Sequence, residues 1–217
     1  MNGNLFDDLP LSDTSEEIIA DGAMILRNFA TAQQQVLLDA IRDIADISPF
    51  RHLVTPGGFT MSVAMTNCGS LGWASDRRGY RYEAIDPLTN RPWPDMPASF
   101  LQLAGAAAAR AGFLDFIPDA CLINRYEIGA RLSLHQDRDE PDRTQPIVSV
   151  SLGIPAMFHF GGMQRSDAVK RFPLGHGDVV VWGGNARLAY HAIAPLKSAH
   201  HPLTGSMRFN LTFRKAG

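Results

Sequence analysis

The chain has 217 residues, of which 45% are hydrophobic and 19% are charged, so it can bury a sizeable core as an ordinary globular protein. Its formal net charge of −2 excludes a global positive field for nucleic acid, and any such contact requires a local basic patch. We expect neither a membrane span nor a secretory signal, because no apolar run approaches roughly 20 residues and no basic segment precedes one. The two cysteines, Cys68 and Cys121, are expected to be free thiols in a reduced, cytoplasmic protein.

Two helices are predicted in the first half of the chain. The capping-box pattern from Thr31 to Gln34 opens the first helix, whose apolar positions follow helical spacing: Val36, Leu37, Ala40, Ile41 and Ile44. The second is expected from about Ser99 to Gly112, with a buried stripe of Leu101, Ala104, Ala107 and Ala108. We expect both helices to support a sheet.

The remaining sequence predicts a mostly β protein with flanking helices. The stretch 51–97 is rich in glycine, proline and aromatic residues and contains one clear alternating strand pattern, from Phe59 to Met65. From Asp119 onward strand follows strand with turn signals between them, as in a β-sandwich or jelly roll. We divide the chain into an N-terminal tail (1–20), an extension (21–98) and a β core (99–217).

Three residues have the spacing of a metal site. His135 and Asp137 stand at i and i+2 on a predicted strand, so their side chains point to the same face, and His191 follows 54 residues after the Asp. Two imidazoles and one carboxylate on one side of a metal leave positions open, as in the facial triad of non-haem Fe(II) oxygenases. His-x-Asp alone is also compatible with a strand-end histidine beside a solvated aspartate.

The C-terminal segment 208–214 predicts a strand with two different faces. Phe209, Leu211 and Phe213 alternate with the polar residues Arg208, Asn210, Thr212 and Arg214. Two guanidiniums on a buried face indicate a small dianion, because arginine matches carboxylates in a bidentate manner. A solvated edge strand is the alternative. The predicted strand 120–126 places Asn124 and Tyr126 on one face, where they could hydrogen-bond the same diacid.

Five segments together resemble the AlkB family: 55–69, 119–142, 146–162, 176–184 and 208–217. The resemblance runs from about Gly22 to the C-terminus. It implies a double-stranded β-helix (jelly roll) with supporting helices and an N-terminal nucleotide-recognition lid formed by 51–97. It also implies Fe(II) held by His135, Asp137 and His191, with 2-oxoglutarate and O₂ as co-substrates.

The resemblance assigns the co-substrate residues as follows. Arg208 and Tyr126 would bind the far carboxylate of 2-oxoglutarate, and Arg214 and Asn124 the carboxylate at the metal end. Asn210 completes the predicted set. The implied reaction is oxidative demethylation of N-alkylated bases such as 1-methyladenine and 3-methylcytosine, with release of formaldehyde, succinate and CO₂.

The lid carries the predicted substrate contacts. Trp73, Tyr80 and Tyr82 lie in loop-like, glycine-flanked sequence, which suits stacking on a base, although such rings can also stabilise an underpacked loop. The resemblance implies that Trp73 and His135 sandwich the base. Asp139 could accept a hydrogen bond from an exocyclic amine, and Arg165 could close the pocket.

We expect the partner to be alkylated DNA, either single-stranded or with a flipped base, because an enclosed iron cannot reach a stacked base. RNA is a further candidate, and the protein is expected to act as a monomer without a membrane. Arg77, Arg78, Arg81, Arg131 and Arg138 are candidates for phosphate contacts.

Other substrates and functions stay open at this point. An oxygenase acting on a free nucleotide or a protein side chain would not stack a base on Trp73. A β-sandwich that only binds a metal or an acid would not form succinate in an O₂-dependent manner. A structural DNA-binding protein fits poorly with the net charge of −2.

Overall fold

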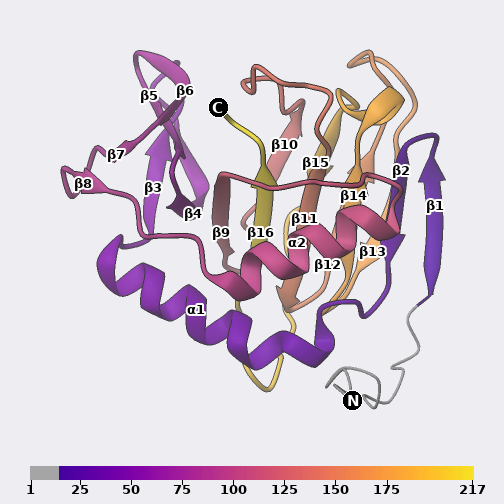
Figure 1. Cartoon of the computed structure of the whole chain (residues 1–217), viewed down its shortest axis with the longest axis horizontal. Helices are drawn as coiled ribbons and strands as arrows, with labels where there is room; N and C mark the ends of the chain where they lie inside the picture. Colours follow the sequence, from indigo (N-terminus) through magenta and orange to yellow (C-terminus); the bar gives the residue numbers. More distant parts are fainter. Residues whose placement is uncertain (1–14) are drawn as a thin grey trace, which may run out of the picture.

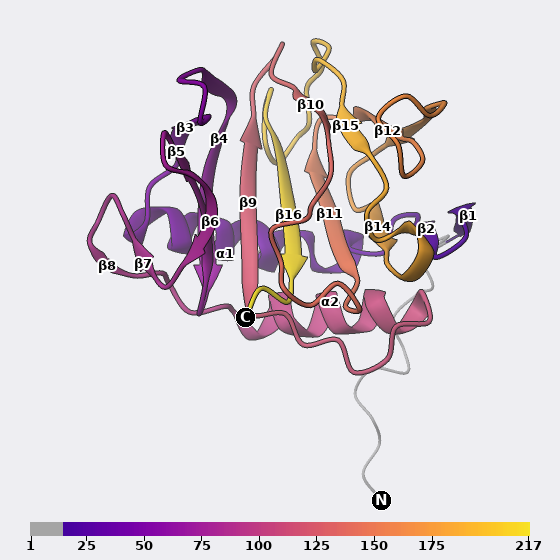
Figure 2. The same ribbon diagram turned by 90° about the horizontal axis from the view of Figure 1, so that it is seen from above.

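The computed structural model describes residues 15–217, which form two antiparallel sheets with two helices outside the larger one (Figures 1 and 2). The larger sheet has eight strands in the order β1 (Glu16–Ala20), β2 (Ala23–Leu26), β14 (Val179–Trp182), β11 (Ile147–Gly153), β16 (Arg208–Arg214), β9 (Ala120–Tyr126), β4 (Thr60–Gly69) and β3 (Arg51–Val54). The smaller sheet has four, in the order β10 (Leu132–His135), β15 (His191–Ile193), β12 (Ala156–Phe160) and β13 (Lys170–Leu174). The predicted jelly roll is confirmed.

The helices α1 (Gln34–Ile47) and α2 (Ala98–Arg110) cover one face of the larger sheet, as predicted (Figure 1). A 3-10 turn, η1 (Thr31–Gln33), precedes α1, and the residue before α1 makes no side-chain capping bond, so the predicted capping box does not form. One core cluster joins both helices to the sheet through Leu37, Ile41, Phe100, Leu103, Val150, Leu211 and Phe213.

Each predicted helix stripe contains one error. Val36 is 48% exposed, and its place in the core is taken by Leu38. Leu101 lies at the surface, whereas Phe100 and Leu103 are buried. In both helices two adjacent rows of apolar residues satisfy helical spacing, and contact with the sheet selects between them.

The central strands bury a different kind of residue on each face. Leu211 and Phe213 of β16 pack against the helices, whereas the polar residues of the same strand point into a cavity between the two sheets. The neighbouring strand β9 aligns its residues with them, with Asn124 opposite Asn210 and Tyr126 opposite Arg208. The strand bounds and faces predicted for both segments are confirmed.

Two small hairpins follow β4, and the first of them contributes Trp73 and Tyr80 to the cavity wall. Strand β5 (Gly72–Asp76) pairs with β6 (Gly79–Glu83), and β7 (Ile85–Asp86) pairs with β8 (Arg91–Pro92). Trp73, Tyr80 and Tyr82 therefore lie on a β-hairpin, and the prediction that they occupy a loop was wrong. Gly72, one of the glycines that suggested a loop, is required by packing, because a Cβ at this position would lie 2.3 Å from the Trp93 ring.

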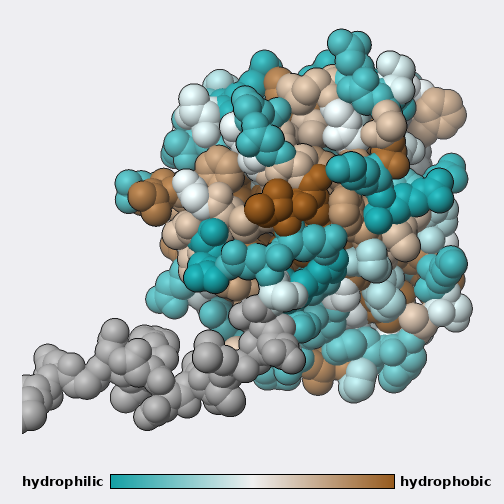
Figure 3. All heavy atoms as spheres, turned by 90° about the vertical axis from the view of Figure 1, so that its right-hand side faces the viewer, coloured by the Kyte–Doolittle hydropathy of each residue, from teal (hydrophilic) through white to brown (hydrophobic). Residues whose placement is uncertain are grey.

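The larger sheet has β1 at one edge and β3 at the other. Residues 16–20, placed in the predicted tail, form β1 and pair with β2, whereas 1–14 lie outside the described residues. Figure 3 shows that this side of the molecule is mostly hydrophilic, with a small hydrophobic area at its centre. Charged residues such as Glu16 and Glu17 on an edge strand hinder pairing with another chain. Among residues 15–217 no helix has the length and apolar character needed to cross a membrane.

Candidate active site

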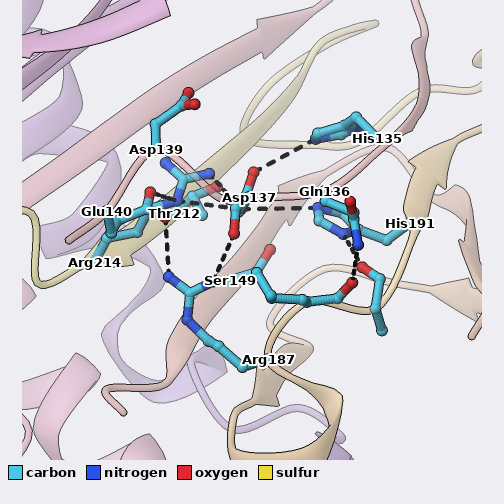
Figure 4. A network of polar contacts seen from close by, with 12 residues as sticks. His135, Gln136, Asp137, Asp139, Glu140, Ser149, Arg187, His191, Thr212 and Arg214 are labelled. Atoms are coloured by element: carbon cyan, nitrogen blue, oxygen red, sulfur yellow. Dashed lines mark hydrogen bonds and ion pairs between the residues drawn. The ribbon is translucent and has the colours of Figure 1, made fainter. Parts of the chain in front are cut away.

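Two neighbouring strands of the smaller sheet bring the three predicted metal ligands together. His135 ends β10 and His191 begins the neighbouring strand β15, where the two residues are register partners. Asp137 follows two residues after β10. One ligand atom from each side chain lies within 4.8 Å of the others, with each imidazole Nε2 pointing toward the carboxylate (Figure 4). The three side chains could hold one metal ion from one side.

Backbone contacts fix which nitrogen of each imidazole faces the metal. Nδ1 of His135 lies 2.7 Å from the Ser133 carbonyl, and Nδ1 of His191 lies 3.1 Å from the Ala189 carbonyl. With Nδ1 donating to a carbonyl, Nε2 keeps its lone pair for a metal. Burial, together with the nearby His135, lowers the pKa of His191 to about 4, so this ligand is neutral at physiological pH.

The carboxylate ligand is held by an arginine. Arg214 donates to Oδ2 of Asp137 from Nη2 at 2.6 Å and from Nε at 3.1 Å. Burial alone would raise the pKa of Asp137, but Arg214 and the two imidazoles outweigh it and hold that pKa below its ordinary value. Arg214 was expected to meet the metal-end carboxylate of a diacid; the structure shows it paired with Asp137 and Glu140, and its contact with a diacid stays a prediction.

The other arginine of β16 lies in a deep pocket without a carboxylate partner among the described residues. Arg208 is fully buried, and its contacts are Ser151 Oγ at 2.7 Å and the Ile154 carbonyl at 3.5 Å. Its Nε is a buried donor with no hydrogen-bond partner in the described part of the chain. Burial lowers the pKa of Arg208 to about 10, so it stays charged at neutral pH. A buried cation with an unused donor fits an anion that enters from the cavity.

Neutral hydrogen-bonding groups lie between the two arginines. Burial raises the pKa of Tyr126, so its hydroxyl stays protonated and can donate. Asn124 bonds weakly to Asn210 at 3.3 Å, and its own Oδ1 has no partner among residues 15–217. All five residues predicted to bind the co-substrate line one cavity of about 780 Å³, which also contains the three metal ligands. The residues present therefore fit a metal with a bound diacid.

The predicted base-binding residues lie at the mouth of this cavity. The rings of Trp73 and Tyr80 stack at 5.4 Å between centroids and 14° between planes, and both line the cavity. Trp73 Nε1 donates to Asp139 Oδ2 at 2.9 Å. Tyr82 is placed differently from its neighbours, because its hydroxyl turns inward and donates to Glu140 at 2.5 Å. It does not line the cavity.

The arginines near the mouth of the cavity differ in their hydrogen-bond and ion-pair partners. Arg165 donates to the Leu134 carbonyl at 2.9 Å and lies on the cavity wall. Arg78 and Arg81 both pair with Asp76, which leaves them poor candidates for phosphate contacts. Arg131 and Arg138 are exposed at the rim and stay candidates.

Sequence reasoning missed a buried pair behind the metal ligands. Glu140 and Arg187 are each 3% exposed and pair at 3.0 Å. Glu140 also lies 3.3 Å from Arg214. They are 47 residues apart in the chain, and both types usually lie at the surface, so no local pattern marks them.

The fold and the site together define a mononuclear metal centre of the His-x-Asp…His type inside a jelly roll. The profile of the 2OG-Fe(II) oxygenase superfamily matches residues 22–214. The chain is 63% identical to the alpha-ketoglutarate-dependent dioxygenase AlkB of Escherichia coli K12, over 93% of this chain and 94% of that protein. It is 46% identical to an AlkB homolog of Caulobacter vibrioides, over 84% and 82% of the two chains. The solved structure of OsALKBH1 superposes with a TM-score of 0.80 at 27% identity, over 93% of this chain and 100% of that one.

The protein belongs to the AlkB family of the 2OG-Fe(II) oxygenase superfamily. It is a dioxygenase that uses Fe(II), 2-oxoglutarate and O₂.

Proposed function

We propose that the protein repairs alkylated DNA by oxidative demethylation of N-alkylated bases such as 1-methyladenine and 3-methylcytosine, with a preference for single strands. The observation that carries this proposal is the position of the Trp73–Tyr80 stack at the mouth of the cavity that holds His135. The His135 side chain is 39% exposed, so its ring offers a face to a planar group that enters the cavity.

The metal site provides the chemistry. His135, Asp137 and His191 would hold the iron, which would supply the chemistry that uses one O₂ to convert 2-oxoglutarate to succinate and CO₂ and to hydroxylate a C–H bond of the substrate. Hydroxylation of an N-methyl group gives an N-hydroxymethyl group, which collapses to formaldehyde and the unmodified base.

The protein side chains orient the reactants for this step. Arg208, with Tyr126 beside it, would bind the far carboxylate of 2-oxoglutarate deep in the cavity. Arg214 pairs with Asp137 and would also steady the metal-end carboxylate, together with Asn124. Arg208 and Arg214 both line the cavity, so the cavity offers positive charge to a dianion. The enclosed cavity limits the access of water to the reacting carbon.

The hairpin residues would bind the base. A base between the Trp73 ring and His135 gains stacking worth about 1–3 kcal/mol. Asp139 lies within reach of an exocyclic amine in the same place, and its negative charge favours a cationic methylated base over a neutral one. A base enclosed in this way must leave the duplex, so a single strand avoids the unstacking cost of a few kcal/mol.

The relatives support a nucleic-acid substrate but differ in what they act on. An Arabidopsis thaliana relative is a DNA N(6)-methyladenine demethylase, and a human relative is a nucleic acid dioxygenase. Alkylated RNA is therefore the second candidate. We also propose that the enzyme acts as a monomer, because one chain supplies every residue of the site, and in the cytoplasm, because Cys68 and Cys121 are free.

The proposal is tested by the coupling of products. Purified protein with Fe(II), ascorbate, 2-oxoglutarate and an oligonucleotide that carries one 1-methyladenine should form succinate and formaldehyde in equal amounts. An oligonucleotide with 5-methylcytosine is the control, because its methyl group sits on carbon and cannot be released in this way. Succinate without formaldehyde would contradict the proposal, and faster turnover of a methylated RNA would favour the second candidate.

A further inference from the structure

A buried carboxylate joins the base-binding hairpin to the metal site. Glu140 follows Asp137 by three residues and contacts three groups: the Tyr82 hydroxyl at 2.5 Å, Arg187 Nη2 at 3.0 Å and Arg214 Nε at 3.3 Å. Tyr82 belongs to β6, so one end of this network lies on the hairpin. The other end is the arginine that holds the metal ligand (Figure 4).

Arg187 fixes the backbone of the same ligand. Its Nη1 donates to the Asp137 carbonyl at 2.7 Å, its Nε to the Gln145 carbonyl at 2.9 Å, and its Nη2 to Glu140. Arg187 directly follows the 3-10 turn η2 (Gly184–Ala186) and precedes the ligand His191 by four residues. A single guanidinium therefore connects the segment that provides Asp137 to the segment that provides His191.

We propose that Arg187 and Glu140 are positioning residues, which hold Asp137 at the metal and link its position to the hairpin through Tyr82. The link to the hairpin rests on the proposed function, because it gives base binding a route to the metal site. The hold on Asp137 requires only the metal centre. Neither Arg187 nor Glu140 belongs to the group of three side chains that could hold the metal, so both act through other groups.

A purely stabilising ion pair is the competing explanation, and it makes different predictions. Removing one partner of a buried pair leaves an uncompensated charge and destabilises the fold whatever its role. Arg187→Lys keeps the charge but cannot donate to three acceptors in the geometry of a planar fork. If the pair only stabilised the fold, this variant would lower the melting temperature and leave metal affinity unchanged.

The test measures metal binding without oxygen or nucleic acid. Mn(II), which does not start the reaction, is titrated into the full-length apoprotein in the presence of 2-oxoglutarate. Arg187→Lys should weaken Mn(II) binding roughly 10- to 100-fold, the usual effect of losing a partner of a metal ligand. Arg27→Lys is the matched control, because Arg27 also bonds a carbonyl and a buried carboxylate, Pro173 and Asp178, outside the metal site. Mn(II) affinity equal to that of wild type in a folded Arg187→Lys protein would overturn the proposal.

The link to the hairpin has its own readout. Tyr82→Phe removes the hydroxyl that bonds Glu140 and keeps the ring, and it should weaken Mn(II) binding several-fold. Tyr80→Phe removes a hydroxyl from the same hairpin without touching Glu140, and Mn(II) affinity should not change. If Arg187→Lys does not fold, the comparison of Tyr82→Phe with Tyr80→Phe still tests the link to the hairpin. Equal Mn(II) affinities in Tyr82→Phe and wild type would overturn that link.

A double-mutant cycle completes the test. Tyr82→Phe combined with Arg187→Lys should weaken Mn(II) binding less than the product of the two single effects, since both act through Glu140. Fully additive effects would overturn the shared route. Because the readout is metal affinity, failure of the proposed DNA substrate would leave these results unchanged.

Discussion

Trp73 donates a hydrogen bond from its indole Nε1 to Asp139 Oδ2 at 2.9 Å, which joins the hairpin to the segment that carries the metal ligand Asp137. The bond spans 66 positions in the chain. It places an aromatic ring and a negative charge on the same side of the cavity mouth. A cationic base that enters there would meet both groups. Replacement of Trp73 therefore tests whether the hairpin recognises the base.

Replacement of Trp73 should separate base binding from the metal chemistry. Trp73→Ala should lower kcat/KM for a methylated oligonucleotide roughly 5- to 150-fold, because stacking is worth about 1–3 kcal/mol and about 1.4 kcal/mol corresponds to a factor of ten. The conversion of 2-oxoglutarate to succinate without oligonucleotide should change little, since Arg208 and the metal ligands lie on the jelly roll. Equal losses in the two assays would assign Trp73 to the fold or the metal site.

Asp137 provides the single anionic ligand of the triad, so its loss should abolish turnover. Asp137→Ala should retain the far-UV circular dichroism of wild type while O₂-dependent succinate formation falls below detection. The replacement also leaves Arg214 with Glu140 as its remaining carboxylate partner, so some loss of thermal stability is expected. The exposed neighbour Asp142, replaced by Ala, is the control and should retain activity. Full turnover by folded Asp137→Ala at limiting iron would rule out the triad.

Arg208 should determine the affinity for the co-substrate. Arg208→Met should raise the KM for 2-oxoglutarate roughly 30- to several-thousand-fold, because an unpaired buried carboxylate costs about 2–5 kcal/mol. The free protein should not be destabilised strongly, since Arg208 has no carboxylate partner among the described residues. Arg125→Met, on the helix-facing side of the adjacent strand, should leave KM unchanged. An unchanged KM in Arg208→Met would mean that the diacid binds elsewhere.

His176 should make the stability of the protein depend on pH. It accepts the Gly153 N–H at 2.9 Å and stacks on His201 at 4.2 Å, and burial together with His201 lowers its pKa from 6.5 to about 4. Between these values the unfolded chain binds a proton that the folded chain does not, so stability falls as the pH drops through this window. His176→Gln keeps an acceptor for Gly153 without titrating. Urea unfolding of the metal-free protein should show a smaller loss of stability for this variant than for wild type on acidification from pH 6.5 to 4. Parallel losses would exclude His176 as the source.

Sequence patterns predicted those site residues that lie on a strand whose polar and apolar residues alternate. In β16 alternate residues differ sharply in polarity, so its cavity-facing side could be assigned before any contact was known. The hairpin of Trp73 and Tyr82 was mistaken for a loop because its two short strands begin with Gly72 and Gly79, a residue type typical of turns. Short strands carry too few residues for alternation to outweigh turn signals.

Contacts between residues far apart in the chain could not be predicted from sequence patterns. The pairing of Arg214 with Asp137 joins residues 77 positions apart, and that of Arg187 with Glu140 joins residues 47 apart. A charged residue gives no local sign of burial, since its partner is brought to it by the packing of two sheets. The assignment of the helix stripes failed for the same reason, because Val36 and Leu38 differ only in which one meets the sheet.

The most direct test of the account follows a single turnover on the substrate itself. Wild-type protein is loaded anaerobically with Fe(II), 2-oxoglutarate and a single-stranded oligonucleotide that carries one 1-methyladenine, and O₂ is then admitted. Mass spectrometry should show an oligonucleotide lighter by one CH₂ unit, with one succinate formed for each methyl group removed and no change when O₂ or 2-oxoglutarate is omitted. An unchanged oligonucleotide alongside full conversion of 2-oxoglutarate to succinate would contradict the account, since the oxygenase would then be active on a different substrate.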